Sequence, residues 1–153
     1  KLEAVLPHCR IQPALLELEL HPSFQQRQLL NYCRQHHIQP MGFCPLGSPN
    51  RPERDRTAED VNDMELPEVL EVARRHHIHP ALVCLKWQVA MGALPIPFSS
   101  RPANYLANLR CITEDPLTPE DLAVLKEAER DCRLIKGQVF LWPGASDWRE
   151  IWT

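Results

Sequence analysis

The chain has 153 residues, of which 44% are hydrophobic and 24% charged, and its formal net charge is -3. This composition is that of a globular domain, and it argues against intrinsic disorder and against electrostatic binding of nucleic acid. No apolar run approaches the ~20 residues of a membrane-spanning helix, and no secretory signal opens the chain, so we expect a cytoplasmic protein without a membrane or nucleic-acid partner.

The first elements form a strand followed by a helix. Residues 2–9 are typical of the end of a helix, and the short apolar run 13–20 predicts a strand by its length. Ser23 and Gln26 have the spacing of a capping box, which predicts a helix that stops near His37.

The second unit begins with a strand predicted at 38–44, and turn-forming residues follow it at 45–50. Residues 51–63 are charged and aperiodic, so we predict a long loop there, with the acids between 53 and 65 on a solvated face. The apolar spacing at 66–77 predicts the next helix.

The remaining elements are a helix at 80–91, which Pro80 opens, a third strand at 93–97 and a helix at 99–109. Thr118 begins a further helix with a capping box. Residues 131–153 are predicted to form an irregular tail.

This alternation of strands and helices predicts an α/β fold of parallel βαβ units. Three strands are too few to close a parallel barrel, which needs eight, and an open sheet of three would expose its edges. The pattern therefore indicates part of a larger fold.

The cysteines and histidines favour structural roles. The six cysteines form no Cys-x-x-Cys pair, so we expect reduced, mostly buried thiols. The histidines at 36–37 and 76–79 lack cysteines at zinc-site spacing, so we predict no metal and interpret them as solvated helix ends. We predict that His21 is a structural partner of Glu19 or of the backbone rather than a catalyst, and that Cys44, which has no neighbouring base, has a packing or hydroxyl-replacing role.

Several segments resemble the aldo-keto reductase family, near its aldose reductase and xylose reductase branches. They are Leu18–Pro22, which contains Glu-Leu-His-Pro, then Asn31–Cys33, Cys44–Pro49, and Ile96–Ser99 with Asn108. The family has the same order of motifs: a strand ending in Glu-x-His-Pro, a helix, a strand ending in Tyr-Ser-Pro-Leu-Gly, and Ile-Pro-Lys-Ser.

The resemblance implies the C-terminal part of a (β/α)8 TIM barrel. Residues 13–20, 38–44 and 93–97 would be strands six to eight, residues 1–130 the partial barrel domain, and 131–153 a substrate-lid tail. The family's catalytic Asp, Tyr, Lys and His come from the first half of the barrel, so no catalytic residue is assigned here. The N-terminal half of the same barrel is the expected partner.

The resemblance also implies a nicotinamide cofactor. Phe43 would stack on the nicotinamide ring, where the family usually has Tyr. Glu17 stands where a Gln usually holds the nicotinamide amide, and an ionised Glu accepts hydrogen bonds but donates none. The segment matching the loop that wraps the pyrophosphate consists of Cys44, Pro45, Leu46, Gly47 and Ser48.

The residues expected to bind the adenosine end of the cofactor differ from the family pattern. Asn50 stands where some members have Asp, and Phe98 where they have Lys, so the ion pair that latches the cofactor is missing. The adenosine phosphate would be left to a helix N-terminus and to Arg101. The other candidates in this segment are Ser99, Ser100, Asn104 and Asn108. The cofactor would be NADP(H) or NAD(H), with a reduced preference for NADP(H).

Phe140 and Trp142 lie where family tails line the substrate pocket, which implies a small aldehyde, ketone or sugar substrate. The favoured hypothesis is a fragment of an NAD(P)H-dependent oxidoreductase that reduces carbonyls to alcohols, inactive in isolation because it lacks the catalytic tetrad. A non-catalytic cofactor-binding or regulatory half-barrel is the alternative, and a decayed reading frame without function is the third.

Overall fold

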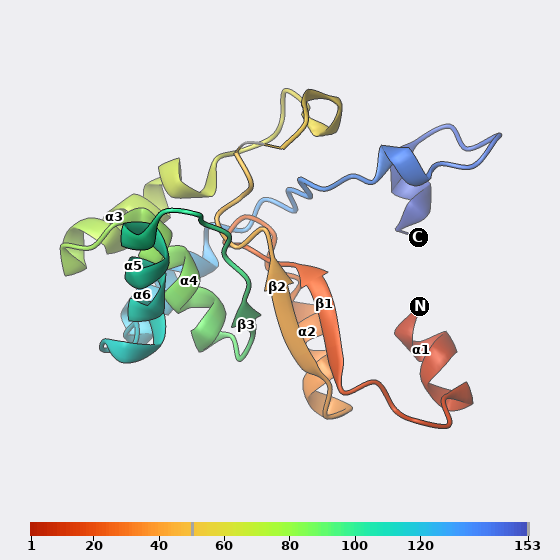
Figure 1. Ribbon diagram of the computed structural model, residues 1–153, viewed down its shortest axis with the longest axis horizontal. Coiled ribbons are helices and arrows are strands. Elements are labelled where there is room, and N and C mark those ends of the chain that lie inside the picture. Colours follow the sequence, from red (N-terminus) through yellow and green to blue (C-terminus); the bar gives the residue numbers. More distant parts are fainter. Residues whose placement is uncertain (50, 153) are drawn as a thin grey trace.

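The computed structural model describes residues 1–49 and 51–152 and contains a parallel sheet of three strands in the order β1-β2-β3 (Figure 1). The strands are β1 (Leu15–Glu19), β2 (Gln39–Phe43) and β3 (Leu94–Pro95). The predicted parallel βαβ arrangement is confirmed, although each strand is shorter than the apolar run that predicted it.

Helices connect and cover these strands. They are α1 (Leu2–Val5), α2 (Arg27–Gln35), α3 (Pro67–His76), α4 (Pro80–Ala90), α5 (Pro102–Thr113) and α6 (Pro119–Lys126). Short 3-10 helices are η1 (Leu6–His8), η2 (Glu53–Asp55), η3 (Asp63–Glu65), η4 (Gln138–Phe140) and η5 (Trp148–Ile151). Proline occupies the first position of α3 to α6, where its missing N–H leaves no helical hydrogen bond unmade.

The core lies between the sheet and the helices on one of its faces. Leu18 pairs in register with Gly42, and both face the helices. Gly42 lies so close to α4 that a Cβ built on it would collide with Gln88 Oε1. The largest fully buried apolar side chains of this core include Leu20, Leu85, Trp87, Leu125 and Leu134.

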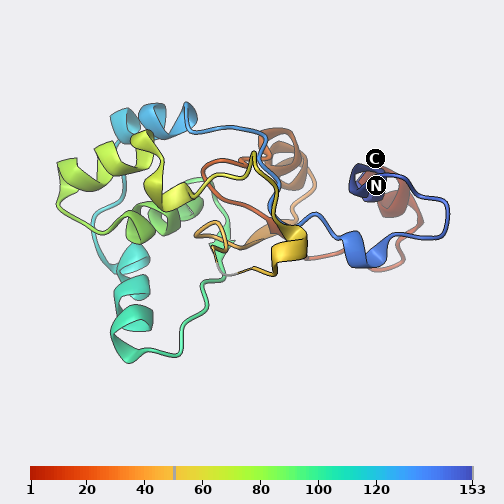
Figure 2. The same cartoon turned by 90° about the horizontal axis from the view of Figure 1, so that it is seen from above.

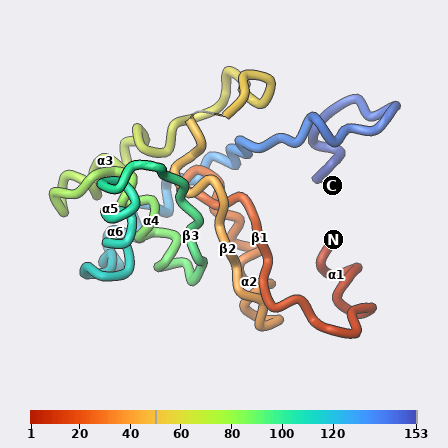
Figure 3. Tube along the Cα trace, in the orientation of Figure 1, coloured from red at the N-terminus to blue at the C-terminus, as the bar shows by residue number. Residues whose placement is uncertain are grey.

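The two chain ends lie together, away from this core. Figure 2 shows the green and cyan helices on one side of the molecule and both termini on the other. The tube in Figure 3 shows the blue tail leaving the sheet region and ending near the start of α1.

The other face of the sheet carries apolar side chains without a covering layer. Leu15 is 41% exposed, Leu94 is 50% exposed, and Ile96, just after β3, is 39% exposed. Parallel sheets are normally buried on both faces. This sheet therefore has half of the packing environment that its topology requires.

The capping box predicted at Ser23 is wrong. Helix α2 begins only at Arg27, and its N-cap Gln26 has a left-handed φ of 43° with no side-chain cap. Ser23 is held elsewhere, because its N–H donates to Asp63 Oδ1 at 2.8 Å and its Oγ lies 3.0 Å from His21 Nδ1. The hydrogen bonds of Ser23 with Asp63 and His21 therefore replace the capping bonds that its local sequence predicted.

The acids between 53 and 65 do not all lie on a solvated face. Asp63 is fully buried, and the side chain of Asp60 is only 10% exposed, because it pairs with Arg51 and Lys136. The charge pattern did not reveal this burial, because one of the two partners of Asp60, Lys136, comes from the tail, 76 residues further along the chain.

The prediction that the histidines at 36–37 and 76–79 are solvated helix ends holds in part. His37, His77 and His79 are exposed, and His36 and His77 are the C-caps of α2 and α3. His79 begins a helix rather than ending one, since its Nδ1 accepts a hydrogen bond from the N–H of Ala81 at 3.1 Å. His76 does end α3, but its Nε2 lies 2.6 Å from Asp121 Oδ2. Both imidazoles therefore have specific partners.

The six cysteines are free thiols. Cys33 and Cys84 are buried and the other four are half-buried, so the prediction of mostly buried thiols holds for two of them.

Within the described ranges, the helices all fall short of the length and apolar character that crossing a bilayer requires.

The capping box predicted at Thr118 is present, and it yields a stability prediction. Thr118 Oγ1 accepts from the N–H of Asp121 at 3.2 Å, and Asp121 Oδ2 accepts from the N–H of Thr118 at 3.0 Å. We expect Thr118→Ala to lower the free energy of unfolding in urea by about 1 kcal/mol, because an N-cap is lost. The matched control is Thr113→Ala, whose hydroxyl is exposed and bonds only within α5. Equal effects of the two substitutions would contradict this role.

Candidate functional site

A cavity of about 450 Å³ lies between the loop that follows β2 and the segment that follows β3. Both segments leave the carboxyl ends of neighbouring parallel strands, which is where parallel α/β folds bind ligands. The cavity is lined by Cys44, Pro45, Leu46, Ser48, Pro49, Arg51, Met64, Ile96, Pro97 and Phe98. Five residues predicted to bind cofactor are thus brought together: Cys44, Pro45, Leu46, Ser48 and Phe98.

The loop after β2 has an unusual backbone. Cys44, Gly47 and Ser48 have left-handed φ values of 51°, 75° and 40°, and the N–H of Gly47 donates to Cys44 O at 2.9 Å. A Cβ at Gly47 would meet Asp63 Oδ2 at 2.5 Å, so the tight turn against this carboxylate requires glycine. Two non-glycine residues in this region of φ mark a loop whose shape the surrounding structure imposes.

Cys44 fits the predicted packing role. Its side chain is half-buried, and burial raises the pKa of its thiol above the ordinary value. A thiol that keeps its proton is a poor nucleophile.

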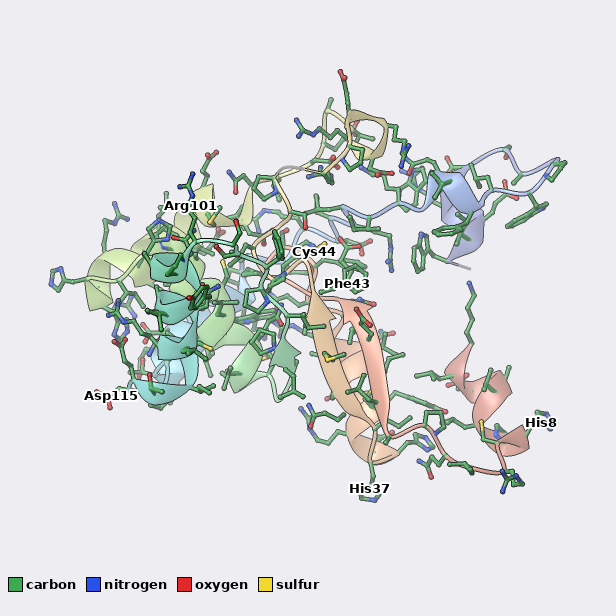
Figure 4. All side chains as sticks on the ribbon, viewed as in Figure 1. His8, His37, Phe43, Cys44, Arg101 and Asp115 are labelled. Atoms are coloured by element: carbon green, nitrogen blue, oxygen red, sulfur yellow. The ribbon has the colours of Figure 1, made fainter. Side chains whose placement is uncertain are left out.

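Phe43 and Glu17 lie on the open face of the sheet rather than in the cavity lining. Phe43 is half-buried and pairs in register with Glu19, and its carbonyl accepts from the N–H of Leu20 at 3.2 Å. Figure 4 shows Phe43 and Cys44 close together at the top of β1 and β2. Glu17, two residues before Glu19, is exposed. Phe43 is therefore next to Cys44, which lines the cavity, whereas Glu17 lies further down the sheet.

The segment from Phe98 to α5 leads away from the cavity. Phe98 is 93% exposed, and Ser99 Oγ accepts from the N–H of Arg101 at 3.2 Å. Arg101 is exposed at the start of α5, well separated from Phe43 in Figure 4. The other candidates of this segment, which also lie outside the lining, are Ser100, Asn104 and Asn108.

Two further predicted residues do not join the cavity. Phe140 and Trp142 lie in the tail and are 76% and 51% exposed, and neither lines the cavity. Asn50 lies outside the described residues.

A buried ion cluster lies next to the cavity. His21 Nε2 is 3.1 Å from Glu19 Oε1, and His21 Nδ1 is 3.0 Å from Asp63 Oδ2. Burial alone would lower the pKa of His21, but the carboxylates of Asp63 and Glu19 outweigh it and raise the pKa to about 9. The predicted pairing of His21 with Glu19 is confirmed, and the imidazole carries a positive charge at neutral pH.

Glu19 also holds the beginning of the tail. Its Oε1 accepts from the N–H of Leu134 at 2.6 Å, and its Oε2 accepts from the N–H of Ile135 at 3.1 Å. Arg133 lies over the rings of Phe24 and Trp152 at 4.6 and 3.9 Å. The carboxylate at the end of β1 therefore fixes where the tail departs from the sheet.

The sequence reasoning missed several residues of this region. Arg51 and Met64 line the cavity, and Lys136 is buried against Asp60. Arg51 follows the predicted pyrophosphate loop Cys44–Ser48 after only Pro49 and Asn50, so its position in the sequence was a usable signal. No local pattern indicates that Lys136 is buried, because its acceptors come from a distant loop.

Comparison with known proteins identifies the class to which this fold and cavity belong. Residues 1–130 match the model of the Aldo/keto reductase family, and the chain belongs to that family. The resemblance found in the sequence is confirmed, and an α/β parallel sheet with helices is consistent with part of the family's barrel.

Individual relatives are similar over most of this chain. An aldo/keto reductase of Synechocystis is 32% identical over 95% of the chain and 44% of its own length. A 9,11-endoperoxide prostaglandin H2 reductase of Trypanosoma cruzi is 29% identical over 95% of the chain and 48% of its own length. The human aldo-keto reductase family 1 member A1 is 29% identical over 88% of the chain and 41% of its own length. The chain thus spans less than half the length of these relatives.

The ion cluster predicts a pH dependence of stability. The pKa of His21 is raised from 6.5 to about 9 in the folded chain, so its contribution is fully present below pH 6.5 and is lost as pH rises through 9. We expect the free energy of unfolding to fall by on the order of 3 kcal/mol over this window. Urea unfolding at pH 6 and pH 9 measures it. His21→Asn should abolish most of the slope, whereas His8→Asn, at an exposed position, should retain it; an unchanged slope in His21→Asn would refute the assignment.

Proposed function

We propose that this chain supplies the cofactor-binding edge and the substrate lid of an NAD(P)H-dependent carbonyl reductase. In this proposal β1, β2 and β3 are strands six to eight of a (β/α)8 barrel, and residues 131–153 form the lid. The observation that carries it is the cavity at the carboxyl ends of β2 and β3, where the loop Cys44–Ser48 and Phe98 meet.

The cavity residues suit a dinucleotide. Ligand sites are mostly apolar with a few placed polar groups, and here the walls are Pro45, Leu46 and Ile96 while Ser48 and Arg51 supply polarity. The aromatic face of Phe43, the neighbour of the cavity-lining Cys44, would hold the nicotinamide by stacking. The bound cofactor would supply the hydride, and this chain's own residues bind and orient it.

The rest of the reductase would cover the open face of the sheet. Leu15, Leu94 and Ile96 are apolar and exposed on the face that, in a closed barrel, points inward. An N-terminal half contributing the first strands would bury them and bring the catalytic groups. The substrate would be a small aldehyde, ketone or sugar, with Phe140 and Trp142 closing over it when the lid packs on the completed barrel.

Turnover separates the two functional hypotheses. We expect the isolated chain to bind NADPH in a calorimetric titration and to show no carbonyl reduction, and we expect reduction once a family N-terminal half-barrel is supplied. Binding without turnover in both cases would support the non-catalytic alternative. Reduction by the isolated chain would contradict the absence of catalytic residues.

The loop geometry predicts which glycine matters for binding. Gly47→Ala should weaken NADPH binding at least tenfold, because its Cβ would displace the loop from Asp63. Gly144→Ala is the matched control, since Gly144 also has a positive φ, 100°, but its Cβ would meet nothing within 4 Å. Equal loss of affinity in both variants, measured by calorimetry, would show that the loop does not form the site.

The residues expected at the adenosine end of the cofactor predict weak discrimination between NADPH and NADH. Phe98 replaces a lysine of the family pattern, and Arg101 remains as the cation nearby, exposed at the start of α5. We expect NADPH and NADH affinities of a full-length protein carrying this segment to differ by less than 100-fold. A larger preference for NADPH would contradict it, and Arg101→Met should reduce NADPH affinity while leaving NADH affinity unchanged.

A further inference from the structure

Three charged side chains join the loop after β2 to the tail. Lys136 Nζ lies 2.6 Å from Asp60 Oδ1, and Arg51 Nη2 forms an ion pair with Asp60 Oδ2. Their side chains are 4%, 10% and 7% exposed for Lys136, Asp60 and Arg51. This cluster is therefore largely removed from water.

The cluster has more positive than negative charge. Arg51 and Lys136 share the single carboxylate of Asp60, and buried charge is costly unless it is paired. Burial would raise the pKa of Asp60, but Lys136, Thr57 and Arg51 lower it to about 2, so the carboxylate stays ionised. The next acid, Glu59, is exposed, and water screens its charge.

The two cations face different sides. Arg51 lines the 450 Å³ cavity between the loop after β2 and the segment after β3, whereas Lys136 and Asp60 line a separate cavity with tail residues. Arg51 is therefore the cation of this cluster that borders the candidate nucleotide site, where its Nη1 also donates to Ser48 O at 3.2 Å.

Asp60 can release Arg51 without losing all of its partners. Besides Lys136, its carboxylate accepts from the N–H of Thr57 at 2.8 Å and from Thr57 Oγ1 at 2.9 Å. Lys136 is itself held by Thr57 Oγ1 at 3.0 Å and Asp55 O at 3.4 Å. Tail and loop thus stay joined when the guanidinium moves.

We propose that Arg51 is a diphosphate-binding residue of the cavity, and that Lys136 of the tail acts as the substitute counter-ion of Asp60 that frees it. This inference rests on the proposed nucleotide function and names the group that would recognise its diphosphate. A guanidinium forms paired, charge-assisted hydrogen bonds with phosphate oxygens. The tail therefore tunes the anion affinity of a loop to which it contributes no cavity residue.

The direct test is calorimetric titration of the full chain with NADPH and, separately, with inorganic pyrophosphate. We expect Arg51→Met to weaken both at least tenfold and Arg51→Lys, which keeps the charge, to weaken them less. The matched control is Arg54→Met on the same loop, which removes one exposed positive charge and should change affinity by less than threefold. Equal effects of Arg51→Met and Arg54→Met would overturn the inference while NADPH binding by the wild type upheld the proposed function.

The counter-ion role is tested by two variants with opposite expected signs. Asp60→Asn should raise pyrophosphate affinity severalfold, because Arg51 is released, and Lys136→Met should lower it, because Arg51 becomes the only cation on Asp60. A loss of affinity in both variants would mean that the cluster only holds the loop in place, and would overturn this role. Pyrophosphate binding that depends on Arg51 without any NADPH binding would uphold the anion site and refute the nucleotide proposal, and binding of neither would refute both.

Discussion

The carboxylate of Glu19 is the point on which the arrangement of strand, loop and tail depends. It ends β1, pairs with the buried imidazole of His21 at 3.1 Å and accepts from the tail backbone at Leu134. Through His21 it is linked to Asp63, whose other oxygen holds Ser23 N–H at 2.8 Å. A buried carboxylate is stable only when its lone pairs are satisfied, so these segments must meet where they do. The glycine turn at Gly47 then packs against Asp63, which positions the neighbouring residues Leu46 and Ser48 that line the cavity.

The sheet is covered by helices on one face only, and this is the second constraint on how the chain can function. The helical face has a complete core around Leu20, Trp87 and Leu125, so the chain holds its own elements in place. The opposite face leaves Leu15 and Leu94 in solvent, which a parallel sheet does not normally tolerate. The cavity lies at the carboxyl ends of the strands, so under the proposed function cofactor binding would depend on these loops, whereas covering the open face would depend on the rest of the reductase.

The sequence predicted what depends on local signals and missed what depends on distant partners. The three strands, the helix that Pro80 opens and the Thr118 capping box follow from apolar spacing and from residues within one turn. The same capping rule failed at Ser23, because Asp63, 40 residues away, takes its N–H. Five cavity residues could be predicted by family resemblance. Arg51 was within reach of the same reasoning, whereas the burial of Asp60 could not be seen without the tail.

The loop after β2 and the tail are coupled because Arg51 of the loop and Lys136 of the tail share the carboxylate of Asp60. If Lys136 were absent, Asp60 would have Arg51 as its only cationic partner, and withdrawing that guanidinium toward a ligand would leave a nearly buried carboxylate without a counter-charge. With Lys136 present, the same withdrawal leaves an intact pair. The tail is anchored at one end by Glu19 and at this point by Asp60, on either side of Ile135. Any movement of the tail that strains the second anchor therefore changes how readily the loop can offer its charge to the cavity.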